Sequence, residues 1–118
     1  MANRFGIPPD IEYKLRARDQ RCVYCRKSMK AYPRTHGTPA DKATIEHLDH
    51  RRPFYWGEGL QRSGIESIAF CCGACNSSRG KKPLTAWFAS AYCEQRNISA
   101  RTVAPVVKRF LERHPSSA

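Results

Sequence analysis

The amino-acid sequence predicts a small α+β fold whose ββα centre is held together by a metal ion. Two Cys-x-x-Cys pairs supply four thiolates: Cys22, Cys25, Cys72 and Cys75. Two short stretches between the pairs have the composition and alternation of β-strands. Stretches with helical periodicity come before and after them, so we expect one N-terminal helix and two C-terminal helices around the centre.

The first half of the chain predicts one helix and one strand. Pro8, Pro9 and Asp10 are typical of a helix entry, and IEYKLRARD follows them directly. Residues 27–42 contain two prolines and a glycine, which indicates a loop. Residues 43–48, ATIEHL, alternate and are rich in β-branched side chains, which predicts a strand.

The second half predicts a strand and three helices. After an aromatic, glycine-bearing excursion over residues 51–64, GIESIAFCC indicates the second strand, and a short helix from Cys75 ends near Gly80. A longer helix is predicted over residues 83–95, with its aromatic stripe in the core. The last helix uses a second apolar stripe and ends before Pro115: Val103, Val106, Val107, Phe110 and Leu111.

The cysteine spacing favours metal binding over disulfides. The N-terminus lacks the apolar segment of a secretion signal, so we expect a cytoplasmic, reducing environment, in which Cys-x-x-Cys pairs bind metals. Four thiolates complete the tetrahedral shell of a structural Zn²⁺. A secreted disulfide framework is the alternative. Cys71 and Cys93 are expected to be buried thiols, and the two-residue spacing favours Cys72 over Cys71 as the ligand.

The net charge favours a polyanionic partner. The 118 residues carry 21 lysines and arginines against 10 acidic residues, a net charge of +11. A positive field of this size on a small protein favours nucleic acid. No apolar run has the length of a membrane span, so we expect no membrane partner.

Two carboxylates and two imidazoles lie within five positions of ATIEHLDH, namely Glu46, His47, Asp49 and His50. Because the thiolates already satisfy the zinc, these residues suggest a second site. A neutral imidazole suits proton transfer from water near neutral pH. Mg²⁺ prefers oxygen ligands and keeps several waters, so one carboxylate and one amide oxygen are a sufficient contribution from the protein.

From CVYC through ATIEH to SIAFCCGACNSSRGKKPL, roughly residues 20–84, the chain resembles the HNH endonuclease family in its four-cysteine, zinc-containing form. The resemblance implies a single HNH-like nuclease domain over residues 1–118, with a helical extension over about 83–114. It further implies DNA cleavage with His47 as general base. Glu46 and Asn76 would then bind a catalytic Mg²⁺ or another divalent ion such as Mn²⁺.

One residue differs from the family pattern, and the acidic-histidine pair has an alternative. Ser67 stands where the second strand usually begins with asparagine. Asp49 and His50, followed by Arg-Arg-Pro, also fit the family's acidic-histidine pair and are the alternative metal ligand and base. The Ala-Thr-Ile run before Glu46 and His47 favours the first pair.

Basic residues near this site are expected to contact phosphates: Arg51, Arg52, Arg79, Lys81 and Lys82. The alternative function is a non-catalytic, zinc-stapled nucleic-acid-binding module. A zinc deaminase is excluded because it requires His-x-Glu and Pro-Cys-x-x-Cys. The sequence leaves open whether the protein acts as a monomer, a homodimer or part of a larger defence or phage complex.

Overall fold

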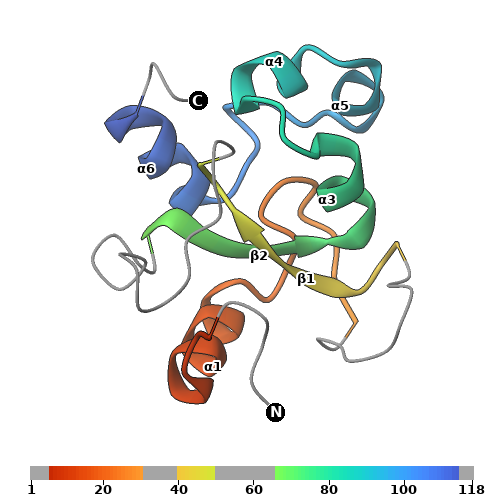
Figure 1. Ribbon diagram of the computed structural model, residues 1–118. Helices are drawn as coiled ribbons and strands as arrows, with labels where there is room; N and C mark the ends of the chain where they lie inside the picture. The colour runs from red at the N-terminus through yellow and green to blue at the C-terminus, as the bar shows by residue number, and fades with distance from the viewer. Residues whose placement is uncertain (1–5, 31–39, 50–65, 115–118) are drawn as a thin grey trace.

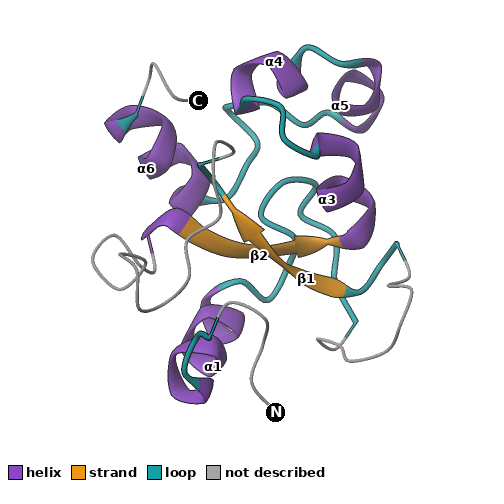
Figure 2. Ribbon diagram, in the orientation of Figure 1, coloured by secondary structure: helices purple, strands orange, loops and turns teal. Residues whose placement is uncertain are grey.

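The computed structural model describes residues 6–30, 40–49 and 66–114. Within these residues the protein is a small α+β fold with a two-stranded antiparallel sheet, five helices and a four-cysteine cluster. Figure 1 shows α1 on one side of the sheet and α3 and α6 on the other, and Figure 2 distinguishes the helices from the strands. None of the described helices has the length and apolar character needed to cross a membrane.

Helix α1, Pro9–Arg18, forms as the sequence predicts. Proline occupies its first turn, acidic residues also lie there, and arginines lie in the last turn, which complements the helix dipole. Directly after the helix, Asp19 is buried and accepts a 2.9 Å hydrogen bond from the Phe70 backbone N–H. This bond attaches the end of α1 to the second strand.

The predicted strands pair with each other. Strand β1, Ala43–His47, is antiparallel to β2, Ile68–Cys72, with Glu46 opposite Ala69 and His47 opposite Ile68. All five residues of β2 are buried, whereas β1 is partly exposed. Two strands alone are marginally stable in water, so this sheet depends on what packs against it.

Helix α3, Gly73–Arg79, begins directly after β2 and completes the ββα order. It ends at Gly80, whose φ of 55° lies in the left-handed region that favours glycine. At seven residues α3 is too short to be stable alone, so contacts with the rest of the protein must hold it in place.

The helix predicted over residues 83–95 is two helices in the structure, α4, Leu84–Phe88, and α5, Ala91–Arg96. The break has a local cause, because the Ser90 side chain accepts a hydrogen bond from the Cys93 N–H and so caps a new helix. Trp87 lies in the core, as expected, with its ring 4.9 Å from the Tyr24 ring in edge contact. The C-terminal part therefore holds three helices rather than two.

The last helix, α6, runs over Pro105–Arg113 and buries one apolar face against the core. Its buried residues are Val106, Val107 and Phe110. The predicted end before Pro115 agrees with the structure, and Val103 lies just ahead of the helix but is also buried. The predicted excursion over residues 51–64 lies outside the described residues.

Candidate functional site

The two Cys-x-x-Cys pairs come together into one compact cluster. The sulfur atoms of Cys22, Cys25, Cys72 and Cys75 all lie within 4.8 Å of one another, and Cys25 Sγ and Cys72 Sγ are 3.9 Å apart. Tetrahedral zinc with Zn–S bonds of about 2.3 Å sets its sulfurs about 3.8 Å apart. The donor set therefore fits a metal ion such as zinc.

Local backbone geometry supports the first pair. The backbone N–H groups of Tyr24 and Cys25 both donate to Cys22 Sγ at 3.4 Å, and the Arg26 N–H donates to the Cys22 carbonyl at 3.0 Å. Arg26 closes this turn in the left-handed region, with a φ of 67°. Hydrogen bonds from N–H groups favour a thiolate over a thiol, which suits a metal ligand.

The second pair uses Cys72 and not its neighbour. Cys72 Sγ lies inside the cluster, 3.9 Å from Cys25 Sγ. Cys71 points to the other face of β2, where its sulfur lies 3.8 Å from Thr44 Oγ1. Cys71 and Cys93 are both buried outside the cluster, as expected from the sequence.

Glu46 lies in a buried polar network. Its Oε2 accepts hydrogen bonds from Tyr24 Oη at 2.5 Å and from Arg79 Nη1 at 2.9 Å. Burial raises the pKa of the Glu46 carboxyl, and the charge of Arg79 and the Tyr24 hydrogen bond oppose that rise. The carboxylate is thus oriented by two partners, one from the first Cys-x-x-Cys turn and one from α3.

Arg79 is the centre of this network. Its side chain is 1% exposed, and besides Glu46 it donates to the carbonyls of His47 at 3.1 Å, Leu48 at 2.8 Å and Lys82 at 2.8 Å. With its guanidinium used inside the protein, the geometry does not favour the phosphate contact expected from sequence. Arg79 instead ties the end of α3 to the chain that leaves β1.

Asn76 joins α3 to β1 one turn earlier. Its Nδ2 donates to Thr44 Oγ1 at 2.9 Å and to the Ile45 carbonyl at 3.2 Å. Among the described residues no hydrogen bond reaches Asn76 Oδ1. The amide oxygen therefore remains available as a ligand beside the strand that carries Glu46 and His47.

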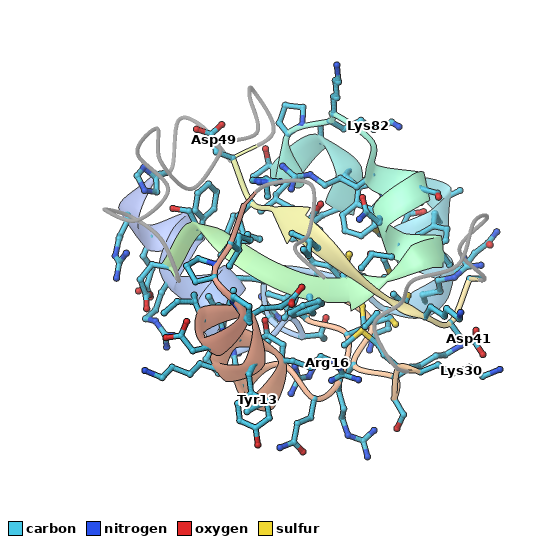
Figure 3. All side chains as sticks on the ribbon, turned by 60° about the horizontal axis from the view of Figure 1, so that its bottom comes forward. Tyr13, Arg16, Lys30, Asp41, Asp49 and Lys82 are labelled. Atoms are coloured by element: carbon cyan, nitrogen blue, oxygen red, sulfur yellow. The ribbon has the colours of Figure 1, made fainter. Side chains whose placement is uncertain are left out.

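His47 ends β1, half-buried, with its Nε2 atom inside the protein. Asp49 follows and is also half-buried. Figure 3 shows Asp49 and Lys82 toward one edge of the molecule, with Tyr13 at the opposite edge. Lys81 and Lys82 are exposed, as a phosphate contact requires.

Three of the predicted site residues, His50, Arg51 and Arg52, lie outside the described residues. Ser67 is buried, and its carbonyl accepts a 2.9 Å hydrogen bond from the Leu48 N–H, which extends the pairing of the strands.

Two partners in this site were not predicted from the sequence. Tyr24 lies inside CVYC, where the tyrosine gave no sign that its hydroxyl would reach Glu46. Thr44 lay two residues before Glu46, with no pattern pairing it with Asn76. Both contacts join segments that are distant in sequence, so only the folded chain could show them.

Comparison with known proteins found no matching family model, no matching curated protein and no matching solved structure. The family resemblance carried by the motifs therefore stays a prediction.

Proposed function

We propose that the protein is a metal-dependent endonuclease or nickase that hydrolyses phosphodiester bonds in DNA. The observation that carries this proposal is the contact between α3 and β1. There, the two Asn76 hydrogen bonds hold the helix against the strand directly before Glu46 and His47. The Asn76 amide is thereby attached to the strand that carries the Glu46 carboxylate and the His47 imidazole.

Each group has a chemical role in this proposal. His47 takes the proton of the attacking water, which a neutral imidazole does well near neutral pH. Glu46 and Asn76 would hold a divalent ion, which polarises a phosphoryl oxygen and supports the leaving group. Tyr24 and Arg79 orient the Glu46 carboxylate, in the way that partners of metal-ligating carboxylates do. Asp49 and His50 are the alternative pair.

Zinc has a structural role in this proposal. Cys22 and Cys25 belong to the first turn, whereas Cys72 and Cys75 lie at the junction of β2 and α3. An ion bound to all four cysteines would fix the start of α3 and hence Asn76. A closed four-thiolate shell has no open position for substrate, so the hydrolytic chemistry belongs to the second site.

One observation favours the second candidate function, a zinc-stapled nucleic-acid-binding module without catalysis. Glu46 is 5% exposed and already forms an ion pair with Arg79, as a purely structural carboxylate would. This function predicts salt-sensitive binding and no cleavage with any divalent ion. The two candidates therefore differ in their response to Mg²⁺ or Mn²⁺.

Conversion of supercoiled plasmid by the zinc-loaded protein, with Mg²⁺ or Mn²⁺ added, tests the proposal. His47→Ala should lower the rate by about 10²- to 10⁴-fold, the usual contribution of a general base, while His50→Ala should retain it. The reverse pattern would move the site to Asp49 and His50. No nicking by the wild-type protein with intact binding would favour the binding module.

A matched control separates the two roles of Asn76. Asn76→Ala removes both the candidate ligand oxygen and the hydrogen bonds to β1, whereas Thr44→Val removes one of those bonds and keeps the oxygen. A rate lost in Asn76→Ala and kept in Thr44→Val supports metal binding. Equal losses would assign Asn76 a structural role.

A further inference from the structure

We infer that a pocket beside the cysteine cluster binds a backbone phosphate of the nucleic acid, on a surface separate from the candidate catalytic residues. The pocket has a volume of about 190 Å³, the space of several water molecules. Two thiolate residues, two cations, a hydroxyl and an aromatic ring are among the groups that line it: Cys25, Cys72, Lys27, Arg96, Ser28 and Tyr92.

Arg96 is already oriented at this pocket. Its guanidinium carbon lies 3.7 Å from the centre of the Tyr92 ring, and its Nη1 donates to the Tyr92 carbonyl at 3.1 Å. Tyr92 is fixed in turn, because its Oη donates to Cys75 Sγ at 3.3 Å. Arginine held in this way loses little entropy when it binds a phosphate with its remaining N–H groups.

Further cations lie next to the residues that line the pocket. Arg21 pairs with Ser28 in an isolated β-bridge and donates to the Arg26 carbonyl at 3.2 Å, while Lys30 pairs with Lys42 in a second bridge. Lys27 and Arg96 line the pocket, and four more cations are paired with or adjacent in the chain to lining residues: Arg21, Arg26, Lys30 and Lys42. All but Lys42 are exposed.

The negative charge nearby is smaller than this positive charge. Asp41 also lines the pocket, but it pairs with Lys30 at 3.1 Å. Four thiolates with one Zn²⁺ carry a net charge of two negative units. The six cations exceed Asp41 and the zinc cluster together by about three charges, so the surface still attracts a polyanion.

The position of the pocket makes it a second anchoring point. Figure 3 shows Lys30 and Asp41 at one edge of the molecule and Asp49 at another. A phosphate held here would fix the nucleic acid away from Glu46 and His47 and set its register on the protein, as contacts to the backbone do. The inference rests on the proposed nucleic-acid substrate but not on its cleavage.

Fluorescence anisotropy with a labelled 20-base-pair DNA duplex tests the inference, using the full zinc-loaded chain without added Mg²⁺ or Mn²⁺. Lys27→Ala/Arg96→Ala should weaken binding about tenfold and lower the slope of log K against log salt by about 1. The matched control is Lys14→Ala/Lys108→Ala on α1 and α6, which removes the same charge from exposed positions that do not line the pocket. The control variant should bind the duplex less than threefold more weakly than the wild-type protein.

Three outcomes are decisive, provided that zinc content shows each variant to be loaded. A loss confined to the pocket variant supports the inference, and Arg96→Lys should then lose part of the affinity because lysine lacks the planar fork. Equal losses in both double variants would overturn it and assign binding to overall charge. A wild-type protein that binds no DNA or RNA would overturn the proposed function itself.

Discussion

Replacing Arg79 by methionine tests the buried network most directly. The substitution keeps an unbranched side chain of related length but leaves the Glu46 carboxylate, 5% exposed, without its cation. It also removes the donors to the carbonyls of His47, Leu48 and Lys82. Breaking a buried ion pair costs about 3–5 kcal/mol, and the unsatisfied carbonyls add about 1–3 kcal/mol.

The sum is comparable to the whole stability of a small domain, about 5–15 kcal/mol. We therefore expect Arg79→Met to be largely unfolded at 37 °C. Arg79→Lys keeps the charge but cannot reach all the acceptors, so it should fold with a loss of about 2–3 kcal/mol. Urea unfolding of the zinc-loaded protein at pH 7, followed by circular dichroism, measures these differences.

A double variant separates the ion pair from the carbonyl contacts. Glu46→Leu/Arg79→Met removes the uncompensated charge, so it should be about 2–3 kcal/mol more stable than Arg79→Met alone. Lys82→Met, an exposed cation three residues away, is the control and should change stability by less than about 0.5 kcal/mol. This account would be refuted if the free energy of unfolding of Arg79→Met were within about 1 kcal/mol of the wild-type value. It would also be refuted if Glu46→Leu/Arg79→Met were no more stable than Arg79→Met.

Three further results follow from the site. Cys72→Ser should lose the bound zinc, whereas Cys71→Ser should retain it because the Cys71 sulfur faces Thr44. Metal analysis after gel filtration measures the zinc content of both variants. The reverse result would show that Cys71, and not Cys72, faces the cluster. Excess EDTA should lower the melting temperature of the wild-type protein sharply, since α3 depends on the cluster; an unchanged melting curve would contradict this. Burial raises the pKa of Glu46 above its unfolded value, so its contribution to stability is full below about pH 4.3 and is lost as the pH rises through the folded pKa. Glu46→Gln should therefore remove that part of the pH dependence of the urea midpoint, and a profile parallel to wild type would contradict the shift.

Local signals in the sequence were sufficient for most of the elements. Pro9 and the charges around it indicated α1, the alternation in ATIEH indicated β1, and Gly80 marked the end of α3. The single helix over residues 83–95 was wrong because apolar periodicity continues across Ala89 and Ser90, while the Ser90 side chain caps a new helix. Periodicity reports which face is buried and does not detect such a break.

The site was predictable only in part, for a similar reason. Spacing alone identified the four cysteines, because two Cys-x-x-Cys pairs are the typical ligand pattern of a zinc site. The role of Arg79 was not predictable, because exposed and buried arginines look alike in sequence. Its burial depends on Tyr24 and Glu46, which approach it only after folding.

The cysteine cluster and the Arg79 network act on the same short helix from its two ends. A metal ion bound to Cys72 and Cys75 would hold the start of α3, and Arg79, the last residue of α3, donates to the Leu48 carbonyl directly after β1. Asn76 lies between these attachments, and a helix of seven residues has little stability of its own. Tyr24 links the two attachments, since it belongs to the first cysteine turn and donates to Glu46. Loss of metal from the cluster should therefore disturb Glu46 and Asn76 together, although neither residue is a ligand of that cluster.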